Sequence, residues 1–222
     1  AETLDDANLA AALARHGLPA PASGVAASPQ EAAALAARIG FPVALKIVSR
    51  AISHKTEAGG VRLNLNTAAE VERAAQALIA AAASAAPGAP IDGFLVQEMV
   101  EGAEVILGAR TDPLYGPMLV VGMGGIMVEL IKDVSFRLLP VTPQDARAML
   151  AERKVATLIA GFRGRPAGDM DALVNAICCL SDFYLDHRHL LRDLEINPLI
   201  VCAKGNGVRA VDVRPVRQGS AP

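Results

Sequence analysis

The chain has 222 residues, of which 52% are hydrophobic and 20% are charged, and its formal net charge is −2. Because the charges are nearly balanced and no run of Lys or Arg exceeds two residues, binding of nucleic acid through a basic face is not expected. The sequence has no uninterrupted apolar stretch of about 18 residues, so we expect no membrane-spanning helix. The acidic start, AETLDD, is unlike a signal peptide, and three cysteines without metal spacing favour reduced thiols in a cytoplasmic protein.

Helices and strands alternate in the first part of the chain. Ser28-Pro29-Gln30-Glu31 predicts a helix start, with a serine N-cap, a proline in the first turn and a capping-box glutamate. Thr67 and Glu70 have the same spacing and predict a second start. The expected helices span residues 4–16, 28–39 and 67–85, and the expected strands span residues 43–48 and 61–65.

The remainder of the chain is richer in strands and predicts an α+β fold with a mostly antiparallel second half. The expected strands span residues 93–100, 104–110, 118–122, 135–140, 192–201 and 208–213, and the expected helices span residues 142–152, 155–160 and 169–187. Pro87-Gly88-Ala89-Pro90 breaks the chain between the two halves. We therefore expect an N-terminal helix and linker over residues 1–25, a first subdomain over residues 26–92 and a second over residues 93–222.

A phosphate pocket is one interpretation of the stretch FPVALKIVSRAISHKTEAGGVRLNL. Lys46 lies inside an apolar strand, where its ammonium must reach a polar site because burying an unpaired charge is too unfavourable. The turn Gly59-Gly60 lets backbone N–H groups approach a ligand closely. With His54 and Lys55, these residues could bind phosphate oxygens. An ordinary β-hairpin with an edge lysine is the alternative.

Oxygen ligands for a metal are predicted near the C-terminus. Glu195 and Asn197 are two residues apart on an expected strand, so their side chains project from one face. Asp212 lies on the expected next strand and can come alongside Asn197. Carboxylate and amide oxygens suit Mg²⁺ that is shared with substrate phosphates. A surface hairpin with ordinary acidic residues is the alternative.

Taken together, these blocks resemble the ATP-grasp fold, and in particular the nucleotide-binding part of the NDP-forming acyl-CoA synthetases, relatives of the β-subunit of succinyl-CoA synthetase. The resemblance rests on FPVALKI, HKTEAGGVRL, VQEMVEGAEVILG, DPLYGPMLVVGMGGIMVELIKDVSFRLLPV and LEINPLIV…AVDVRPV, which occur in the family's order. It implies two α/β subdomains with the nucleotide site between them. The implied cofactors are ATP or ADP, with GTP or GDP possible, and Mg²⁺.

The resemblance assigns nucleotide contacts where residues match the family pattern. Lys46 is implied to contact the α- and β-phosphates, and Gly59 and Gly60 to belong to a mobile loop that closes over the phosphates. Glu104 is placed near the ribose. The adenine would be held by backbone groups of a hinge made of Gln97, Glu98, Met99 and Val100.

The resemblance also assigns metal and phosphoryl-transfer roles. Asn197 and Asp212 match the family's Mg²⁺ ligands, and Glu129 is a further contact near the metal or the triphosphate. Arg137 is interpreted as an anion contact. His54 matches a histidine proposed to relay the phosphoryl group, and a neutral imidazole is a competent nucleophile near pH 7. A loop histidine that bonds a carbonyl is the alternative for His54.

The implied reaction converts acyl-CoA, NDP and phosphate to the acid, CoA and NTP, or the reverse. It requires a CoA-binding domain and a ligase domain, or an α-subunit, carrying the main phosphohistidine, so we interpret this chain as a β-type subunit or an excised domain of an oligomeric enzyme. Two alternatives stay open. One is a non-catalytic regulatory or assembly module, like those fused to protein acetyltransferases, and the other is a carboxylate–amine ligase of the wider ATP-grasp group.

Overall fold

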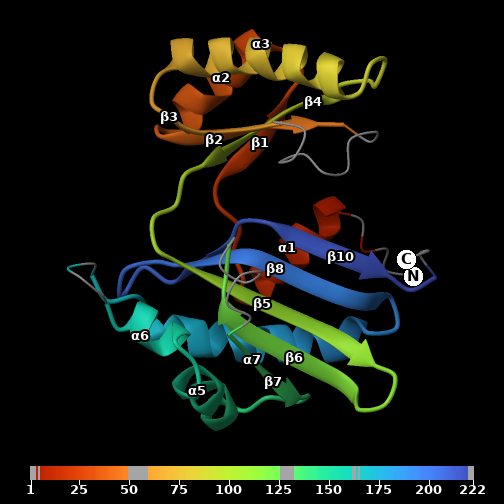
Figure 1. Cartoon of the computed structure of the whole chain (residues 1–222), viewed down its shortest axis with the longest axis vertical. Coiled ribbons are helices and arrows are strands. Elements are labelled where there is room, and N and C mark those ends of the chain that lie inside the picture. Colours follow the sequence, from red (N-terminus) through yellow and green to blue (C-terminus); the bar gives the residue numbers. More distant parts are fainter. Residues whose placement is uncertain are drawn as a thin grey trace. The chain divides into compact units, whose positions relative to one another are not determined.

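A computed structural model describes residues 4, 6–49, 60–125, 133–161, 164 and 166–219. The chain divides into two compact units at Met99 and Val100 (Figure 1). Pro21–Met99 forms the smaller unit, and the residues up to Ala20 join those from Val100 onward in the larger one. The structure therefore groups the N-terminal helix with the second half of the chain, whereas the sequence analysis treated residues 1–25 as a separate segment.

The smaller unit is a four-stranded antiparallel sheet covered on one face by two helices (Figure 1). Its strand order is β1-β4-β2-β3. Val43, Leu45 and Phe94 project from the sheet into a core that they share with both helices. The elements are β1 (Ser23–Ala26), α2 (Pro29–Ile39), β2 (Val43–Val48), β3 (Val61–Leu65), α3 (Ala68–Ala85) and β4 (Gly93–Glu98).

Local capping signals place both helices of this unit as predicted. The Ser28 hydroxyl accepts a hydrogen bond from the Glu31 N–H, and the Thr67 hydroxyl accepts one from the Glu70 N–H, each at 3.2 Å. The two glutamate side chains reach back one residue further than in a standard capping box, to the N–H groups of Ala27 and Asn66. These bonds satisfy backbone donors that a helix start otherwise leaves without partners.

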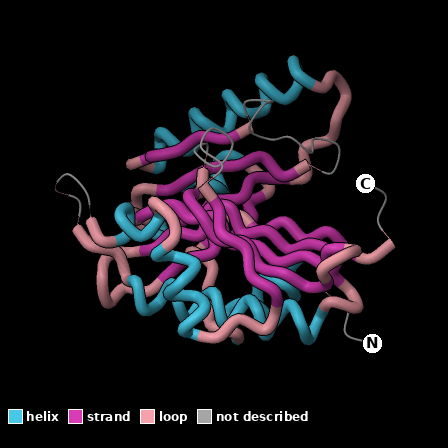
Figure 2. Tube along the Cα trace, turned by 60° about the horizontal axis from the view of Figure 1, so that its bottom comes forward, coloured by secondary structure: helices cyan, strands magenta, loops and turns pink. Residues whose placement is uncertain are grey.

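The larger unit is an antiparallel sheet with its helices packed against one face, as Figure 2 shows from a second direction. The strand order is β10-β8-β5-β6-β7, and β9 also pairs with β8. The core contains Val105 and Leu107 of the sheet with Ile177 and Tyr184 of α7, all fully buried. The elements are α1 (Asp6–Arg15), β5 (Ala103–Asp112), β6 (Gly116–Met123), β7 (Val134–Leu138), α5 (Pro143–Ala151), α6 (Val155–Ile159), α7 (Met170–His187), β8 (Leu191–Val201), β9 (Val208–Ala210) and β10 (Val213–Arg217).

Three features differ from the sequence analysis. β1 was not predicted. β4 pairs with β1 and β2 and so belongs to the smaller unit, whereas the second subdomain was expected to begin at residue 93. The expected strand over residues 208–213 is two strands, because its partner β8 contains Pro198, which has no N–H to continue the ladder.

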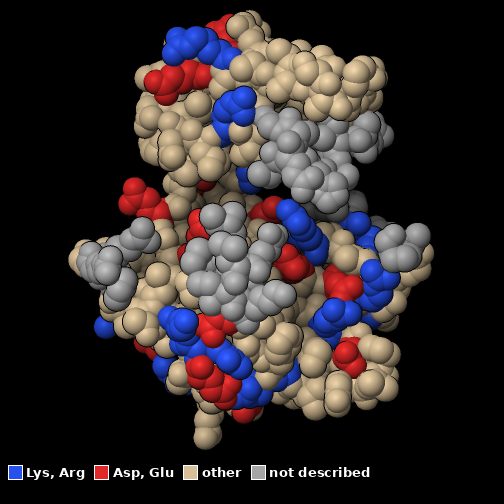
Figure 3. Space-filling model, viewed as in Figure 1, with Lys and Arg blue, Asp and Glu red and all other residues tan. Residues whose placement is uncertain are grey.

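The surface carries mixed charge on the larger unit, while α3 of the smaller unit, which is mostly alanine, exposes few charges (Figure 3). Acidic and basic side chains alternate on the visible face of the larger unit, in keeping with the small net charge. Within the described ranges, no helix combines the length and the apolar character that crossing a membrane requires.

Candidate functional site

Lys46 projects from the face of the smaller sheet that α2 and α3 do not cover. Leu45 and Ile47 on either side of it are buried and point toward the helices, so alternation along β2 turns Lys46 to the opposite face. The Lys46 Nζ donates a hydrogen bond of 2.9 Å to the Oε1 atom of Gln97, a β4 residue that is only 5% exposed. The predicted phosphate lysine is thus held on this face by a neighbouring amide.

The predicted adenine segment, residues 97–100, is tied to the smaller unit through its backbone. The N–H of Glu98 donates to the carbonyl of Ala22 at 2.8 Å, and the N–H of Met99 donates to the carbonyl of Pro42 at 3.1 Å. The Glu98 carboxylate in turn accepts from the Ala22 N–H at 3.1 Å. A base held by this segment would therefore have to use other backbone groups, including those of Val100.

Asn197 lies at a β-bulge of the larger unit and is bonded to Asp212 through the backbone. Val105 pairs with Leu199 and Leu107 with Ile196, so β8 contains one more residue than β5 between these pairs. The Asn197 N–H donates to the Asp212 carbonyl at 2.9 Å, across the short link between β9 and β10. The juxtaposition predicted from the sequence is therefore present, although Asp212 lies between two strands rather than within one.

Gly125 connects Asn197 with Glu104. The N–H of Gly125 donates to the Oδ1 atom of Asn197 at 2.9 Å. A Cβ atom on Gly125 would lie 1.9 Å from Oε2 of Glu104, so the carboxylate passes directly over this glycine. Gly125 has φ +62°, a conformation that glycine adopts without strain. Two oxygen-bearing side chains from β5 and β8 thus meet at one glycine.

A pocket of about 440 Å³ opens in the larger unit, and Glu104 is one of its lining residues. Its lining includes Val100, Glu104 and Ile200, together with Leu158 and Pro166. Apolar walls with a few polar groups at the rim are typical of small-molecule sites. Glu104 thus both lines the pocket and passes over Gly125, whose N–H bonds the Asn197 side chain.

Four predicted site residues, His54, Lys55, Gly59 and Glu129, lie outside the described residues. Gly60 is described, and its carbonyl accepts a hydrogen bond of 2.9 Å from the Ile47 N–H. The end of the predicted glycine turn is thus joined to β2, one residue from Lys46.

A family model described as an ATP-grasp domain matches residues 1–216. The chain belongs to the ATP-grasp domain family. Its relatives include the acetate–CoA ligase [ADP-forming] II subunit beta of Pyrococcus furiosus, which is 37% identical over 93% of this chain and 88% of the subunit. The 4-hydroxybutyrate–CoA ligase [ADP-forming] of Nitrosopumilus maritimus is 42% identical over 91% of this chain, which spans only 29% of that ligase.

Solved structures of ADP-forming ligase relatives have the same fold as this chain. The dinucleotide-forming acetyl-coenzyme A synthetase 1 of Ca. Korarchaeum cryptofilum, in complex with coenzyme A, Ca-AMPCP and HgCl⁺, has a TM-score of 0.85 and 37% identity, covering 93% of this chain and 89% of that one. A second structure of that synthetase, with coenzyme A and Mg-AMPPCP, has a TM-score of 0.78 and 32% identity. This ATP-grasp domain therefore corresponds to the nucleotide-binding, β-subunit-type part of ADP-forming acyl-CoA ligases.

The two predicted metal ligands, Asn197 and Asp212, carry oxygen atoms of the kind that magnesium binds. Among the described residues, no group of three or more His, Cys, Asp or Glu side chains could form an all-protein metal cage. Mg²⁺ is usually bound by one or two protein oxygens together with substrate phosphates and water. The amide oxygen of Asn197 and the carboxylate of Asp212 match that requirement. The Arg214 guanidinium lies 3.5 Å from the Asp212 carboxylate and partly balances its charge.

Among the described residues of the larger unit, Arg137 lies apart from the predicted site residue Glu104. Arg137 lies on β7 and pairs with Leu119 of β6. Glu104 lies on β5 next to Val105, and Val105 pairs with Met123, at the other end of β6. The Arg137 guanidinium forms an ion pair with Glu152 at the end of α5.

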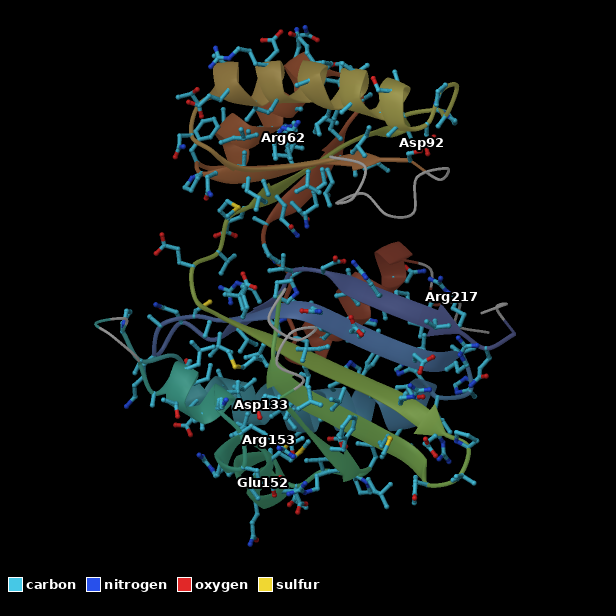
Figure 4. All side chains as sticks on the ribbon, in the orientation of Figure 1. Arg62, Asp92, Asp133, Glu152, Arg153 and Arg217 are labelled. Atoms are coloured by element: carbon cyan, nitrogen blue, oxygen red, sulfur yellow. The ribbon has the colours of Figure 1, made fainter. Side chains whose placement is uncertain are left out.

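The Arg137 ion pair has an electrostatic consequence for Glu152. Hydrogen bonds from Arg137 and then from the Ser135 hydroxyl lower the pKa of the Glu152 carboxyl. Figure 4 labels Glu152 together with Asp133 and Arg153, which come from the same junction of β7, α5 and α6. The geometry of Arg137 is that of a structural ion pair at the edge of the sheet.

Sequence reasoning missed two contributors to the site. The side chain of Gln97 was not singled out, because only the backbone of its segment was expected to act. Gly125 was not predicted as a site residue, although the pair Gly124-Gly125 is a signal of close backbone approach. Gly124 confirms that signal, since a Cβ there would lie 2.5 Å from the carbonyl carbon of Val105.

Proposed function

We propose that this ATP-grasp domain binds a Mg-nucleotide and exchanges a phosphoryl group with a histidine, as the β-type half of an NDP-forming acyl-CoA synthetase. The meeting of Asn197 and Glu104 at Gly125, beside an apolar pocket, carries the proposal. It provides hard oxygen atoms for a metal next to space for a flat base. The relatives named as ADP-forming ligases supply the reaction class.

Each described residue has a role that its position supports. Asn197 and Asp212 would hold Mg²⁺, which offsets negative charge on the phosphates when it is bound. Lys46 would contact the phosphates with its ammonium group from the smaller sheet. Glu104 would accept hydrogen bonds from the ribose hydroxyls at the rim of the pocket. The backbone of residues 97–100 would hold the base.

The phosphoryl group would move to and from His54. As the terminal phosphorus–oxygen bond of the nucleotide breaks, the imidazole nitrogen forms the new bond to phosphorus, and NDP leaves. Phosphohistidine then passes its phosphoryl group onward for the interconversion of acyl-CoA and acid. A structure of the related synthetase with Mg-AMPPCP has its phosphohistidine segment pointing towards the nucleotide-binding site, which supports a histidine carrier.

The complete reaction would require a CoA-binding partner. Relatives carry this domain either as a subunit beta or as less than a third of a longer ligase. The partner would be an α-subunit or fused domains that bind CoA and carry the main phosphohistidine, in an oligomeric cytoplasmic enzyme. ATP or ADP is the proposed nucleotide, with GTP or GDP as the alternative.

Calorimetric titration of the chain with ADP and ATP, with and without Mg²⁺, tests the nucleotide site. We expect Mg²⁺-dependent binding that Lys46→Ala and Asp212→Asn each weaken by about tenfold or more. The matched controls are Lys204→Ala and Asp182→Asn, two exposed positions of the larger unit that should bind as the unchanged chain does.

The second stage adds the CoA-binding subunit and measures nucleotide-dependent thioester formation. Activity that requires Lys46 and Asp212 would support the synthetase assignment. Nucleotide binding without any thioester formation in the assembled complex would instead favour a regulatory module. Failure of the chain to bind nucleotide either alone or in the complex would overturn the proposal.

A further inference from the structure

Arg214 lies on the same face of the larger sheet as the two predicted metal ligands. Val213 of β10 and its pairing partner Ile196 of β8 both contact the core, which the helices cover. Alternation along the chain therefore turns Asp212 and Arg214, on either side of Val213, to the opposite, open face of the sheet. Asn197 follows the buried Ile196 and turns to the same open face.

Two carboxylates flank Arg214 on the open face. Asp212 precedes it by two residues, and Glu195 is its pairing partner on β8. With both carboxylates ionised, these three side chains together carry one net negative charge, which disfavours a phosphate group. A divalent cation held by Asn197 and Asp212 would make the same group net positive. The metal and the guanidinium would then both attract phosphate oxygens.

The ion pair between Arg214 and Asp212 is long and open to solvent. The Nη2 atom of Arg214 lies 3.5 Å from the Oδ2 atom of Asp212, whereas hydrogen bonds between a cationic N–H and a carboxylate are usually about 2.7–2.9 Å long. The Arg214 side chain is 68% exposed, and the Asp212 side chain is 43% exposed. Exposed pairs of this kind contribute little to stability, so Arg214 can exchange this partner for another at a small loss.

Arginine is also the side chain best suited to the ligand. Its planar guanidinium donates two parallel hydrogen bonds to the oxygens of one phosphate, and it keeps its charge at all physiological pH values. Arg137, which the sequence analysis interpreted as the anion contact, instead forms an ion pair with Glu152. Arg214 has the chemistry expected of that contact and lies beside a predicted metal ligand.

We propose that Arg214 is a phosphate-binding residue, which pairs with Asp212 in the free chain and with a terminal phosphate of the nucleotide once Mg²⁺ is bound at Asp212. This inference rests on the proposed function, in which Asn197 and Asp212 hold Mg²⁺. It deepens that function by placing the anion contact of the larger unit on β10 instead of β7.

Titration calorimetry of the intact chain with Mg-ADP, Mg-ATP and AMP tests the phosphate contact. Arg214→Met removes the charge and keeps an unbranched side chain. We expect this variant to bind Mg-ADP and Mg-ATP about tenfold more weakly, because a charge-assisted bond to phosphate is lost. AMP has no terminal phosphate, so its affinity should change by less than about twofold.

Mn²⁺ alone, titrated with EPR detection, provides a readout that a merely structural role would not give. Mn²⁺ accepts the same oxygen ligands as Mg²⁺. Removing the positive charge beside Asp212 should strengthen Mn²⁺ binding about two- to fivefold, the range expected from an exposed ion pair, while nucleotide binding weakens. Arg214→Lys keeps the charge but not the planar fork, so it should leave Mn²⁺ affinity unchanged and lose part of the nucleotide affinity.

Arg110→Met is the matched control. Arg110 lies on β5 of the same sheet, its side chain is 58% exposed, and its Nε atom lies 3.4 Å from the Asp193 carboxylate. This variant should bind nucleotide and Mn²⁺ as the unchanged chain does.

The two failures can be told apart. If the unchanged chain binds Mg-nucleotide and Arg214→Met binds it equally well, only this inference is overturned. Mn²⁺ affinity that is unchanged or weakened in Arg214→Met would overturn it too, because the charge would then have no effect at the metal site. If the unchanged chain binds no nucleotide, alone or with its CoA-binding subunit, the proposed function itself fails.

Discussion

The backbone N–H of Gly125 donates a 2.9 Å hydrogen bond to the side-chain oxygen of Asn197. The bond joins the glycine bend after β6 to the bulge of β8, two segments far apart in the sequence. It also fixes the orientation of the Asn197 amide, because an N–H donor must face the oxygen and not the NH₂ group. A carbonyl oxygen has two lone pairs, so this bond occupies one of them.

Replacing Gly125 with alanine should weaken Mg-nucleotide binding by about tenfold, because the new Cβ would displace the Glu104 carboxylate and disturb the bond to Asn197. The matched control is Gly116→Ala at the start of β6. Gly116 also has a positive φ, of 86°, but a Cβ there would meet open space. Both variants should lose about 1 kcal/mol of unfolding free energy from the left-handed backbone. Equal nucleotide affinity in the two variants would contradict the role given to Gly125.

Arg137 forms an ion pair in the structure, whereas the sequence led us to expect an anion contact. Substitutions of Arg137 and of its partner Glu152 distinguish these two roles. If its role is the pair with Glu152, Arg137→Met and Glu152→Gln should each lower the thermal midpoint slightly and leave nucleotide affinity unchanged. If Arg137 binds an anion of the substrate, Arg137→Met should weaken nucleotide binding and Glu152→Gln should not. Thermal unfolding and calorimetric titration of the two variants decide between these roles.

The helices were predictable because their signals are local. Ser28 and Thr67 bond N–H groups three residues away, and such spacings can be recognised directly in a sequence. β1 was missed because Ser23–Ala26 is short, with apolar residues only at its end, and its partner β4 lies about seventy residues later. The division of β9 from β10 could have been inferred from Pro198 inside the neighbouring strand.

The candidate site was predictable only where residues share a hairpin or a strand. Asn197 and Asp212 lie on the two sides of the hairpin that β8 and β9 form, so their proximity followed from the sequence. The approach of Glu104 to Gly125 depends on the register of β5 against β6, which the sequence does not reveal. The pairing of Arg137 with Glu152 likewise depends on how α5 packs beside β7.

The Tyr184 hydroxyl is a buried polar group whose removal should destabilise the larger unit. It donates to the carbonyl of Arg192 at 2.6 Å, so the 2.9 Å contact with Thr111 uses the threonine hydroxyl as donor. Tyr184→Phe would leave both partners without this bond inside the core, and the free energy of unfolding should fall by about 1–2 kcal/mol. Tyr115→Phe is the control, because the Tyr115 side chain is 69% exposed and should contribute nothing measurable. A urea titration of both variants measures the difference.

Asp169 should make stability depend on pH in the acid range. Its carboxylate accepts hydrogen bonds from the N–H groups of Gly207, Ala172 and Gly205, which clamp the start of α7 to the turn before β9. These bonds, with that from Gly207 the largest cause, lower the pKa of Asp169 from its ordinary value of 3.8. Because the folded-state pKa of Asp169 is depressed, the stabilisation is fully present well above pH 3.8, begins to fall about one pH unit above that value and is lost as the pH falls through the lower folded-state pKa.

Asp169→Asn tests this pH dependence, because asparagine keeps an accepting oxygen but has no charge to titrate. Near neutral pH the variant should be less stable by about 1 kcal/mol, the usual size of a capping effect at a solvated site. The difference between the two proteins in denaturant-unfolding free energy should stay constant down to about pH 5 and shrink at lower pH. Asp182→Asn, at an exposed position of the same helix, should show no such trend. A difference for Asp169→Asn that persisted unchanged to about pH 2 would show that the charge does not contribute.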